Sequence, residues 1–96
     1  MLTTKDRAKL RSYANTMETI LQIGKEGVTA NVLKQIDEAL IAREMIKVRV
    51  LENSLRSAKD AATEISSQID CEIIQCIGTR IVIYRAFEKD PIYPLK

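Results

Sequence analysis

A short glycine-bracketed loop is the segment of this sequence best suited to binding chemistry. It reads Gly24-Lys25-Glu26-Gly27 and stands between an apolar run and a helix-like stretch. Glycine lacks a Cβ atom and takes positive φ readily, so two glycines permit a tight turn and the close approach of another backbone. Lys25 adds a mobile positive charge, and the N–H groups that open the next helix attract anions. The loop therefore suits a phosphate, although Gly-x-x-Gly also occurs in ordinary turns.

A second candidate feature is the density of basic residues near the N-terminus. The first eleven residues hold four basic side chains against one acidic side chain, Asp6. Over the whole chain 15 Lys and Arg stand against 13 Asp and Glu, a net charge of +2. This balance argues against indiscriminate binding to polyanions, and it leaves room for a local basic face. The four basic residues are Lys5, Arg7, Lys9 and Arg11.

The sequence is poor in residues for catalysis or metal binding. It has no histidine, and its two cysteines, Cys71 and Cys76, are five positions apart. A structural zinc site takes four Cys or His ligands in short paired spacings, and a Walker loop needs Gly-x-x-x-x-Gly-Lys-Ser/Thr. We expect no enzymatic activity, metal, cofactor or small-molecule substrate. Both cysteines are interpreted as small buried residues in a strand.

Length and composition indicate one folded domain spanning residues 1–96. The chain is 46% hydrophobic and 29% charged, which suits a modest core and not a disordered segment. No apolar run approaches the ~20 residues of a membrane helix, and the N-terminus becomes charged at once. We expect a monomeric cytoplasmic protein away from membranes. A tail over 88–96 carries both prolines and is expected to lie extended over the surface.

Periodicity predicts three elements in the first half of the chain. Thr4 suits the N-cap of a helix over 4–15, and Thr29 that of a helix that continues to about residue 43. Between them the β-branched run 19–23 favours a buried strand that ends at Gly24. The apolar positions at helical spacing in or just beyond these two helices are Leu10, Tyr13, Ala14, Met17, Leu33, Ile36 and Leu40.

The middle of the chain predicts a half-buried strand followed by a helix. Residues 45–51 alternate between apolar and basic side chains, so Lys47 and Arg49 should form an outer row. Asn53 and Ser54 offer N-caps for the helix. Its inward positions should be Ala58, Ala61, Ala62, Ile65 and Ile69.

The last part predicts an antiparallel hairpin. Two apolar runs, 71–77 and 80–85, are separated by Gly78-Thr79, and a two-residue Gly-x link is typical of a type II′ turn. The order of elements is therefore α-β-α-β-α-β-β. It indicates an α/β (α+β) domain with a mixed four-stranded sheet covered by helices.

Several of these segments together carry a resemblance to a known family. They are Leu2-Thr3-x-Lys5-x-Arg7-x-x-Leu10-Arg11, Ile23-Gly24-Lys25-x-Gly27-Val28-Thr29, Ile36-Asp37-Glu38-Ala39-Leu40, Ile46-Lys47-Val48 and Ile77-Gly78-x-Arg80-Ile81-Val82-Ile83-Tyr84-Arg85. In this order they resemble the CRM domain, the chloroplast RNA splicing and ribosome maturation domain. In bacteria that domain occurs as a free-standing YhbY-like protein. The likeness runs across nearly the whole chain.

The resemblance implies a KH-like RNA-binding fold related to the C-terminal domain of bacterial translation initiation factor three. It also implies binding to precursor large-subunit ribosomal RNA during ribosome assembly. The glycine loop of the family maps onto residues 24–27, and the family's basic first helix onto Lys5, Arg7, Lys9 and Arg11. Glu26 departs from the pattern because it places a carboxylate where a phosphate would rather meet a neutral or basic residue.

The expected mechanism is recognition of the RNA backbone, with the loop glycines pressed against phosphates and Lys25 forming a salt-sensitive ion pair. Secondary contacts are expected from the strand residues Lys47, Arg49, Arg80 and Arg85. Tyr13 and Tyr84 are interpreted as core residues, which limits base stacking. The alternative is a protein-interaction adaptor without direct RNA contact, for which an exposed apolar patch would be the signature.

Overall fold

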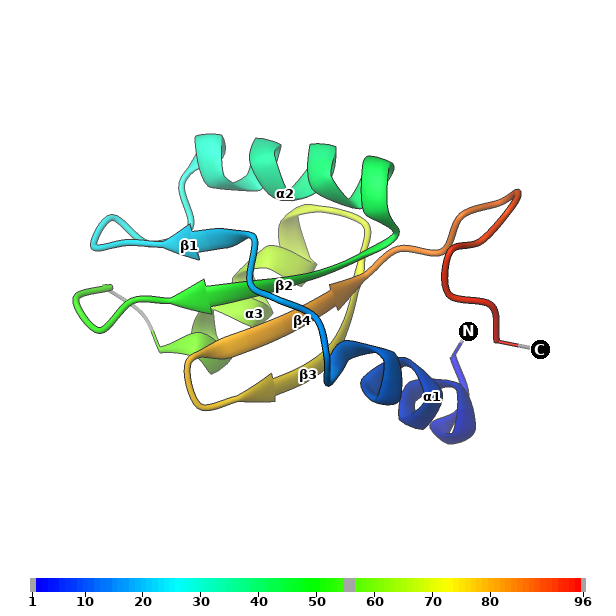
Figure 1. Ribbon diagram of the computed structural model, residues 1–96. Helices are drawn as coiled ribbons and strands as arrows, with labels where there is room; N and C mark the ends of the chain where they lie inside the picture. The colour runs from blue at the N-terminus through cyan, green and yellow to red at the C-terminus, as the bar shows by residue number, and fades with distance from the viewer. Residues whose placement is uncertain (1, 55–56, 96) are drawn as a thin grey trace.

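Three helices and four strands follow one another in the computed structural model, which describes residues 2–54 and 57–95. The elements are α1 (Thr4–Ala14), β1 (Leu21–Ile23), α2 (Ala30–Arg43), β2 (Met45–Val50), α3 (Ala58–Gln68), β3 (Glu72–Ile77) and β4 (Arg80–Tyr84). This order is the predicted one (Figure 1). The expected domain and its tail include Met1 and Lys96, which lie outside the described residues.

The four strands form one mixed sheet in the order β1-β2-β4-β3. β1 and β2 are parallel and are joined by α2, as a parallel pair requires a long crossover. The other two pairs, β2 with β4 and β3 with β4, are antiparallel. The predicted mixed sheet is confirmed, and β1 and β3 are its edges.

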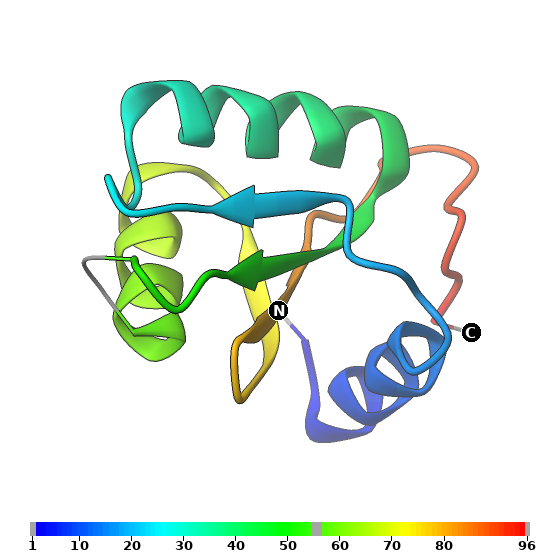
Figure 2. The ribbon, with the colours of Figure 1, turned by 60° about the vertical axis from the view of Figure 1, so that its left-hand side comes forward.

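Each face of the sheet has its own hydrophobic core. α2 and α3 cover one face, while α1 and the C-terminal tail cover part of the other (Figures 1 and 2). The buried residues of the α2 and α3 side include Ile36, Leu40, Ile65, Ile46, Val48, Ile81 and Ile83. Those of the α1 side are Leu10, Ala14, Met45, Ile74, Val82 and Tyr84. The sheet is therefore the middle layer of the domain.

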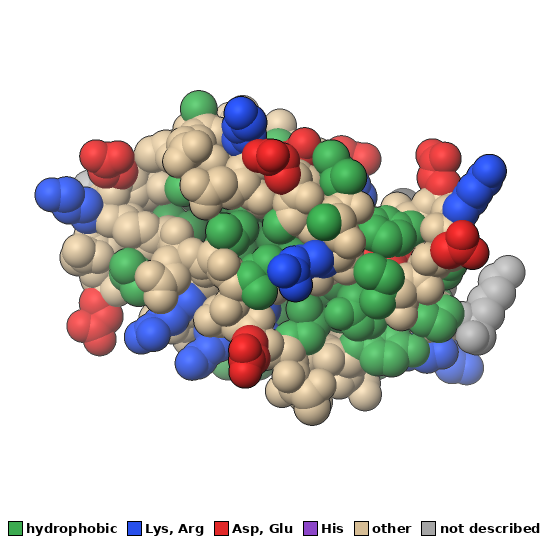
Figure 3. All heavy atoms as spheres, turned by 45° about the horizontal axis from the view of Figure 1, so that its top comes forward, with side chains coloured by type: hydrophobic (Ala, Val, Ile, Leu, Met, Phe, Trp, Pro, Cys, Tyr) green, Lys and Arg blue, Asp and Glu red, His purple; other side chains and the backbone are tan. Residues whose placement is uncertain are grey.

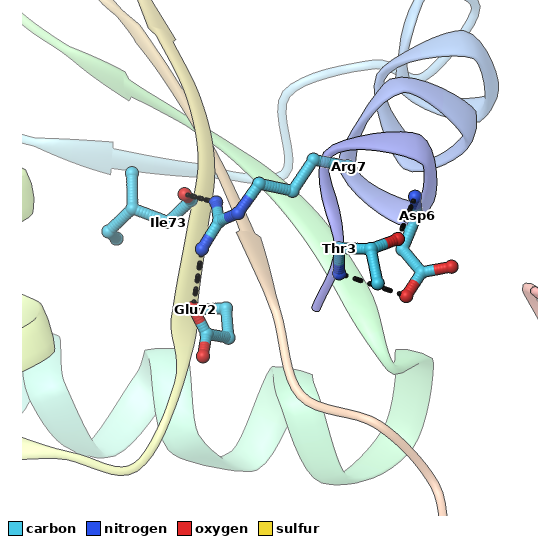
Figure 4. Close-up of polar contacts among 5 residues, drawn as sticks. All are labelled: Thr3, Asp6, Arg7, Glu72 and Ile73. Atoms are coloured by element: carbon cyan, nitrogen blue, oxygen red, sulfur yellow. Dashed lines mark hydrogen bonds and ion pairs between the residues drawn. The ribbon is translucent and has the colours of Figure 1, made fainter. Parts of the chain in front are cut away.

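Two of the predicted helix caps are wrong. α1 is capped by Thr3, whose hydroxyl accepts from the Asp6 N–H while its own N–H donates to the Asp6 carboxylate, both at 3.0 Å (Figure 4). α3 is capped by Ser57, not by the earlier polar pair Asn53 and Ser54. In both cases an acidic residue stands three positions after the true cap, the pattern of a capping box. The predicted cap at Thr29 is confirmed.

Strand boundaries shift by a residue or two, and one burial prediction fails. β1 begins at Leu21 and not at residue 19, and Ile20 just before it is 38% exposed. Cys71 precedes β3 and is half-buried, but Cys76 is exposed, which contradicts its predicted burial. Cys76 lies near the end of an edge strand, beside Ile77, which is 65% exposed. Gly78 alone has positive φ (59°) in the link to β4, as a type II′ turn requires.

A buried carboxylate that sequence reasoning missed fixes the C-terminal tail. Glu44 lies between α2 and β2 with φ of 67° and no exposed surface. Its two oxygens accept N–H groups of Phe87, Ile92 and Tyr93 at 2.7 to 2.9 Å. The Tyr93 ring packs against the Tyr13 ring of α1, with 5.3 Å between the two ring centroids. The tail thereby helps to hold α1 on the sheet.

Candidate nucleic-acid interface

The glycine loop is a closed turn with its two charged residues at the surface. The Gly27 N–H donates to the Gly24 carbonyl at 3.0 Å, and Lys25 and Glu26 are both exposed. Gly27 is buried and has φ of 72°, a conformation that favours glycine. Gly24 does not have positive φ, and a Cβ atom added there would meet nothing within 4 Å. Of the two glycines, only Gly27 is needed for the turn itself.

The loop leads into a helix whose N-terminus carries no neutralising acid. Thr29 accepts the Val32 N–H at 3.2 Å, which completes the cap. The first turn of α2 contains no acidic residue, whereas Asp6 and Asp60 occupy the first turns of α1 and α3. The partial positive charge of this helix end is therefore not reduced by a carboxylate of its own first turn.

Three connections meet at the same end of the sheet. Because β1 and β2 are parallel, the loop 24–27 and the segment 51–54 leave the sheet together, and the Leu51 N–H donates to the Ile23 carbonyl at 2.9 Å. The turn of the β3–β4 hairpin joins them, since the Val50 N–H donates to the Thr79 carbonyl at 2.7 Å. This end lies at the left of Figure 1.

The four basic residues of α1 are not equivalent. The Arg7 guanidinium donates to the Ile73 carbonyl and to the Glu72 carboxylate, each at 2.9 Å (Figure 4). Arg7 thus ties α1 to the bulged edge strand β3. Lys5 is exposed and Lys9 and Arg11 are half-buried, and none of these three is recorded in an ion pair with a described residue.

The four basic residues predicted on the strands also differ in their contacts, and Arg85 lies just after the end of β4. Arg85 donates to the Asp37 carboxylate and the Asp70 carbonyl, both at 2.7 Å, and so links α2 to the start of β3. Lys47 is half-buried, and Arg49 and Arg80 are exposed. Arg49 lies directly opposite Arg80 in the register of β2 and β4. Arg7 and Arg85 therefore stabilise the fold, whereas the side chains of Lys5, Arg49 and Arg80 are exposed.

The candidate residues form three groups and not one cluster. Residues 24–27 lie at one end of the sheet. α1 packs at the other end, over Met45 and Tyr84, where β2 begins and β4 ends. Lys47, Arg49 and Arg80 lie on strands between them. Sequence spacing alone did not show this separation.

Among residues 2–54 and 57–95, no three metal-ligating side chains come together, and no helix is long and apolar enough to cross a membrane. Burial raises the pKa of the Cys71 thiol to about 11, so it is protonated at neutral pH. Burial and the nearby Glu44 carboxylate raise the pKa of Tyr84.

An apolar groove lies on the side of β1 that faces the tail. It has a volume of about 400 Å³, and Met17, Ile20, Met45, Ile92 and Tyr93 contribute to its walls. Ile92 is 51% exposed. Figure 3 shows hydrophobic side chains gathered on this face beside the tail. Such a surface is compatible with a protein contact.

Comparison with known proteins gives one consistent family. Residues 2–85 match the model of the CRS1/YhbY (CRM) domain. The Bacillus subtilis protein named probable RNA-binding protein YqeI is 45% identical over 85 residues, which are 88% of each chain. A Haemophilus influenzae protein named RNA-binding protein is 30% identical over 91 residues, 95% of this chain and 92% of its own.

One solved structure has the same fold as this chain. The solution structure of a hypothetical protein from Staphylococcus aureus superimposes with a TM-score of 0.83 at 43% sequence identity, and the match covers 100% of both chains.

Proposed function

Because this chain belongs to the CRS1/YhbY (CRM) domain family, we propose that it binds RNA through the loop 24–27 and the basic residues of α1. The relatives from Bacillus subtilis and Haemophilus influenzae carry names that describe them as RNA-binding proteins. The observation that carries the proposal is the geometry of the loop. Its backbone is open at Gly24, its charge is exposed at Lys25, and it opens a helix without a first-turn acid.

The mechanism is recognition of phosphates and not of bases. N–H groups at the start of α2 would donate to a phosphate oxygen, and Lys25 would add an ion pair that salt weakens. Glu26 is exposed at the tip of the loop and is free to turn towards solvent. KH-type modules clamp about four nucleotides of single strand with such a loop. The RNA class we propose is ribosomal RNA, free or in a precursor of the large subunit, in the cytoplasm during ribosome assembly.

No catalytic step is part of the proposal, since RNA binding by backbone contacts requires none. The protein is proposed to act as a monomer whose single domain presents the loop and α1 to the RNA. Of the α1 residues, Lys5, Lys9 and Arg11 would provide the contacts, because Arg7 is already paired with Glu72.

The test is a salt series of binding to single-stranded and structured fragments of large-subunit ribosomal RNA. Lys25→Ala removes one loop charge, and Lys89→Ala removes one exposed charge from the tail as a matched control. We expect Lys25→Ala to bind RNA more weakly. The slope of log affinity against log salt concentration should also fall by the contribution of about one phosphate contact. Equal affinities and slopes for both variants and the native chain would remove the loop from the mechanism.

A second candidate function is that of a protein-interaction adaptor, and the apolar groove beside the tail favours it. In that case the native chain would fail to bind any of the RNA fragments, and substitution of Ile20 or Ile92 by Ser would abolish capture of a protein partner. The two candidates therefore predict opposite effects for loop and groove variants.

A further inference from the structure

One part of the sheet remains uncovered on the α1 side. α1 packs over Val82 and Tyr84 but not over the next row of residues towards the loop end. That row crosses all four strands, because neighbours in register point to the same face. Gln22 pairs with Arg49, Arg49 with Arg80, and Arg80 with Ile77. All four side chains are exposed, and we call this row the open sheet face.

Two like charges stand directly opposite each other at the centre of the open sheet face. Cβ atoms of such cross-strand pairs are typically about 5 Å apart, and like charges in this position destabilise a sheet. No ion pair or side-chain hydrogen bond with a described residue is recorded for Arg49 or Arg80. By contrast, Arg7 and Arg85 each have a carboxylate partner. Within residues 2–54 and 57–95, Arg49 and Arg80 thus face each other with no carboxylate paired to either of them.

The position of the pair connects the two other basic groups. Arg49 is the last but one residue of β2, next to the end at which loop 24–27 leaves the sheet. Lys47, two residues earlier on the same face, leads towards α1. Arg49 and Arg80 lie between the loop end of the sheet and α1, so a strand of nucleic acid that follows this face can contact both of them.

We propose that the open sheet face binds the sugar–phosphate backbone of a single RNA strand, with a phosphate held between Arg49 and Arg80. This inference rests on the proposed function and names the path of the RNA. Guanidinium groups form two parallel hydrogen bonds to phosphate oxygens, and a shared anion removes the repulsion between the two arginines. Tyr84, on the same face, is 3% exposed under α1 and cannot stack on a base. Binding on this face is therefore tolerant of sequence.

The test compares the double variant Arg49→Gln/Arg80→Gln with Arg43→Gln/Lys59→Gln, which removes two exposed charges from α2 and α3 on the opposite side of the sheet. With a single-stranded ribosomal RNA fragment, we expect the first variant to lose about tenfold or more in affinity and its salt slope to fall by about 0.7. Scrambling the RNA sequence should leave this loss unchanged. Inorganic phosphate should compete only weakly.

The same variant should be more stable than the native chain. Removal of the cross-strand repulsion is expected to raise Tm by roughly 1 to 5 °C without RNA, while the control variant shows no such rise. Higher stability together with weaker RNA binding would mark a ligand site and not a folding defect.

The inference is overturned if Arg49→Gln/Arg80→Gln binds RNA as the native chain does while Lys25→Ala does not. That result would leave the proposed function intact and limit it to the loop. Competition by inorganic phosphate at the same concentration as RNA phosphate would also overturn it, since the site would then hold a free anion. Failure of the native chain to bind RNA would instead end both proposals.

Discussion

Gly24 and Gly27 bracket the same loop, but only Gly27 has a backbone conformation that favours glycine. Gly27 adopts φ of 72°, where a Cβ atom costs about 1–2 kcal/mol. Gly24 has neither positive φ nor a neighbour that a Cβ atom would touch. The free energy of folding therefore gives no reason for glycine at position 24, whereas the proposed close approach of a phosphate would give one.

Gly24→Ala should consequently fold as well as the native chain, or more stably by up to about 1 kcal/mol because the unfolded chain loses freedom. Its RNA affinity should fall, since the methyl group occupies space that a phosphate would use. Gly27→Ala is the contrasting variant and should lower the free energy of unfolding. Thermal melts and RNA titrations of the two variants test this. Native RNA affinity in Gly24→Ala would show that no ligand approaches this residue closely.

Cys71 makes stability depend on pH in the alkaline range. Burial raises the pKa of its thiol from 9.0 to about 11 in the folded chain. Above pH 9 the unfolded chain releases this proton first, so it binds fewer protons than the folded chain and stability falls as pH rises. The decrease should extend from about pH 9 to 11, and Cys71→Ala should reduce it. Chemical denaturation at several pH values measures the effect, and an equal slope in both chains would exclude Cys71 as its source.

At the scale of elements, the C-terminal tail and α1 depend on each other. The tail is fastened by three N–H donors to Glu44, and it lies against α1 through the Tyr13 and Tyr93 rings. The Tyr13 hydroxyl also donates to the Pro94 carbonyl at 3.2 Å. Loss of the Glu44 carboxylate would leave these donors unpaired unless the tail moves into solvent.

Glu44→Ala is therefore expected to release the tail and to lower the free energy of unfolding by about 1–3 kcal/mol. Hydrogen exchange at the amides of Phe87, Ile92 and Tyr93 should accelerate, whereas amides of β2 and β4 should remain protected. Glu38→Gln, an exposed change on α2, is the control. Unchanged exchange at the three amides would show that Glu44 does not hold the tail.

The helices and strands could be predicted from sequence because each depends on the spacing of nearby residues. The alternation in β2 and the helical spacing of Ile36 and Leu40 report which side chains are buried, and the structure agrees. The caps at Thr3 and Ser57 were missed, although an acid three residues later marks each of them. The exposure of Cys76 could not be predicted from sequence, because it depends on which strand becomes the edge of the sheet.

The candidate site could be predicted only in part, because the contacts of a basic side chain depend on the fold of the whole molecule. The loop 24–27 is a local motif and can be read from four residues. Whether an arginine is open or paired depends on residues far away in sequence: Arg7 pairs with Glu72, and Arg85 with Asp37. Nine basic residues were proposed from sequence, and two of them, Arg7 and Arg85, pair with carboxylates of the fold.

The distribution of charge over the molecule points to a ligand longer than a single phosphate. The chain measures 39 Å in its longest dimension, and the loop and α1 lie at opposite ends of the sheet. A compact anion can occupy only one of the basic groups. Under the proposed function, an extended RNA strand would contact the loop, the open sheet face and α1 at once.

The most direct measurement is a titration of the isotopically labelled chain with a single-stranded fragment of large-subunit ribosomal RNA, followed by the shifts of its backbone amide signals. The account predicts shifts at residues 24–31, at Arg49 and Arg80, and on the exposed side of α1, with little change at the apolar groove. Shifts confined to residues that line the groove, or no shifts at all at low salt, would contradict it.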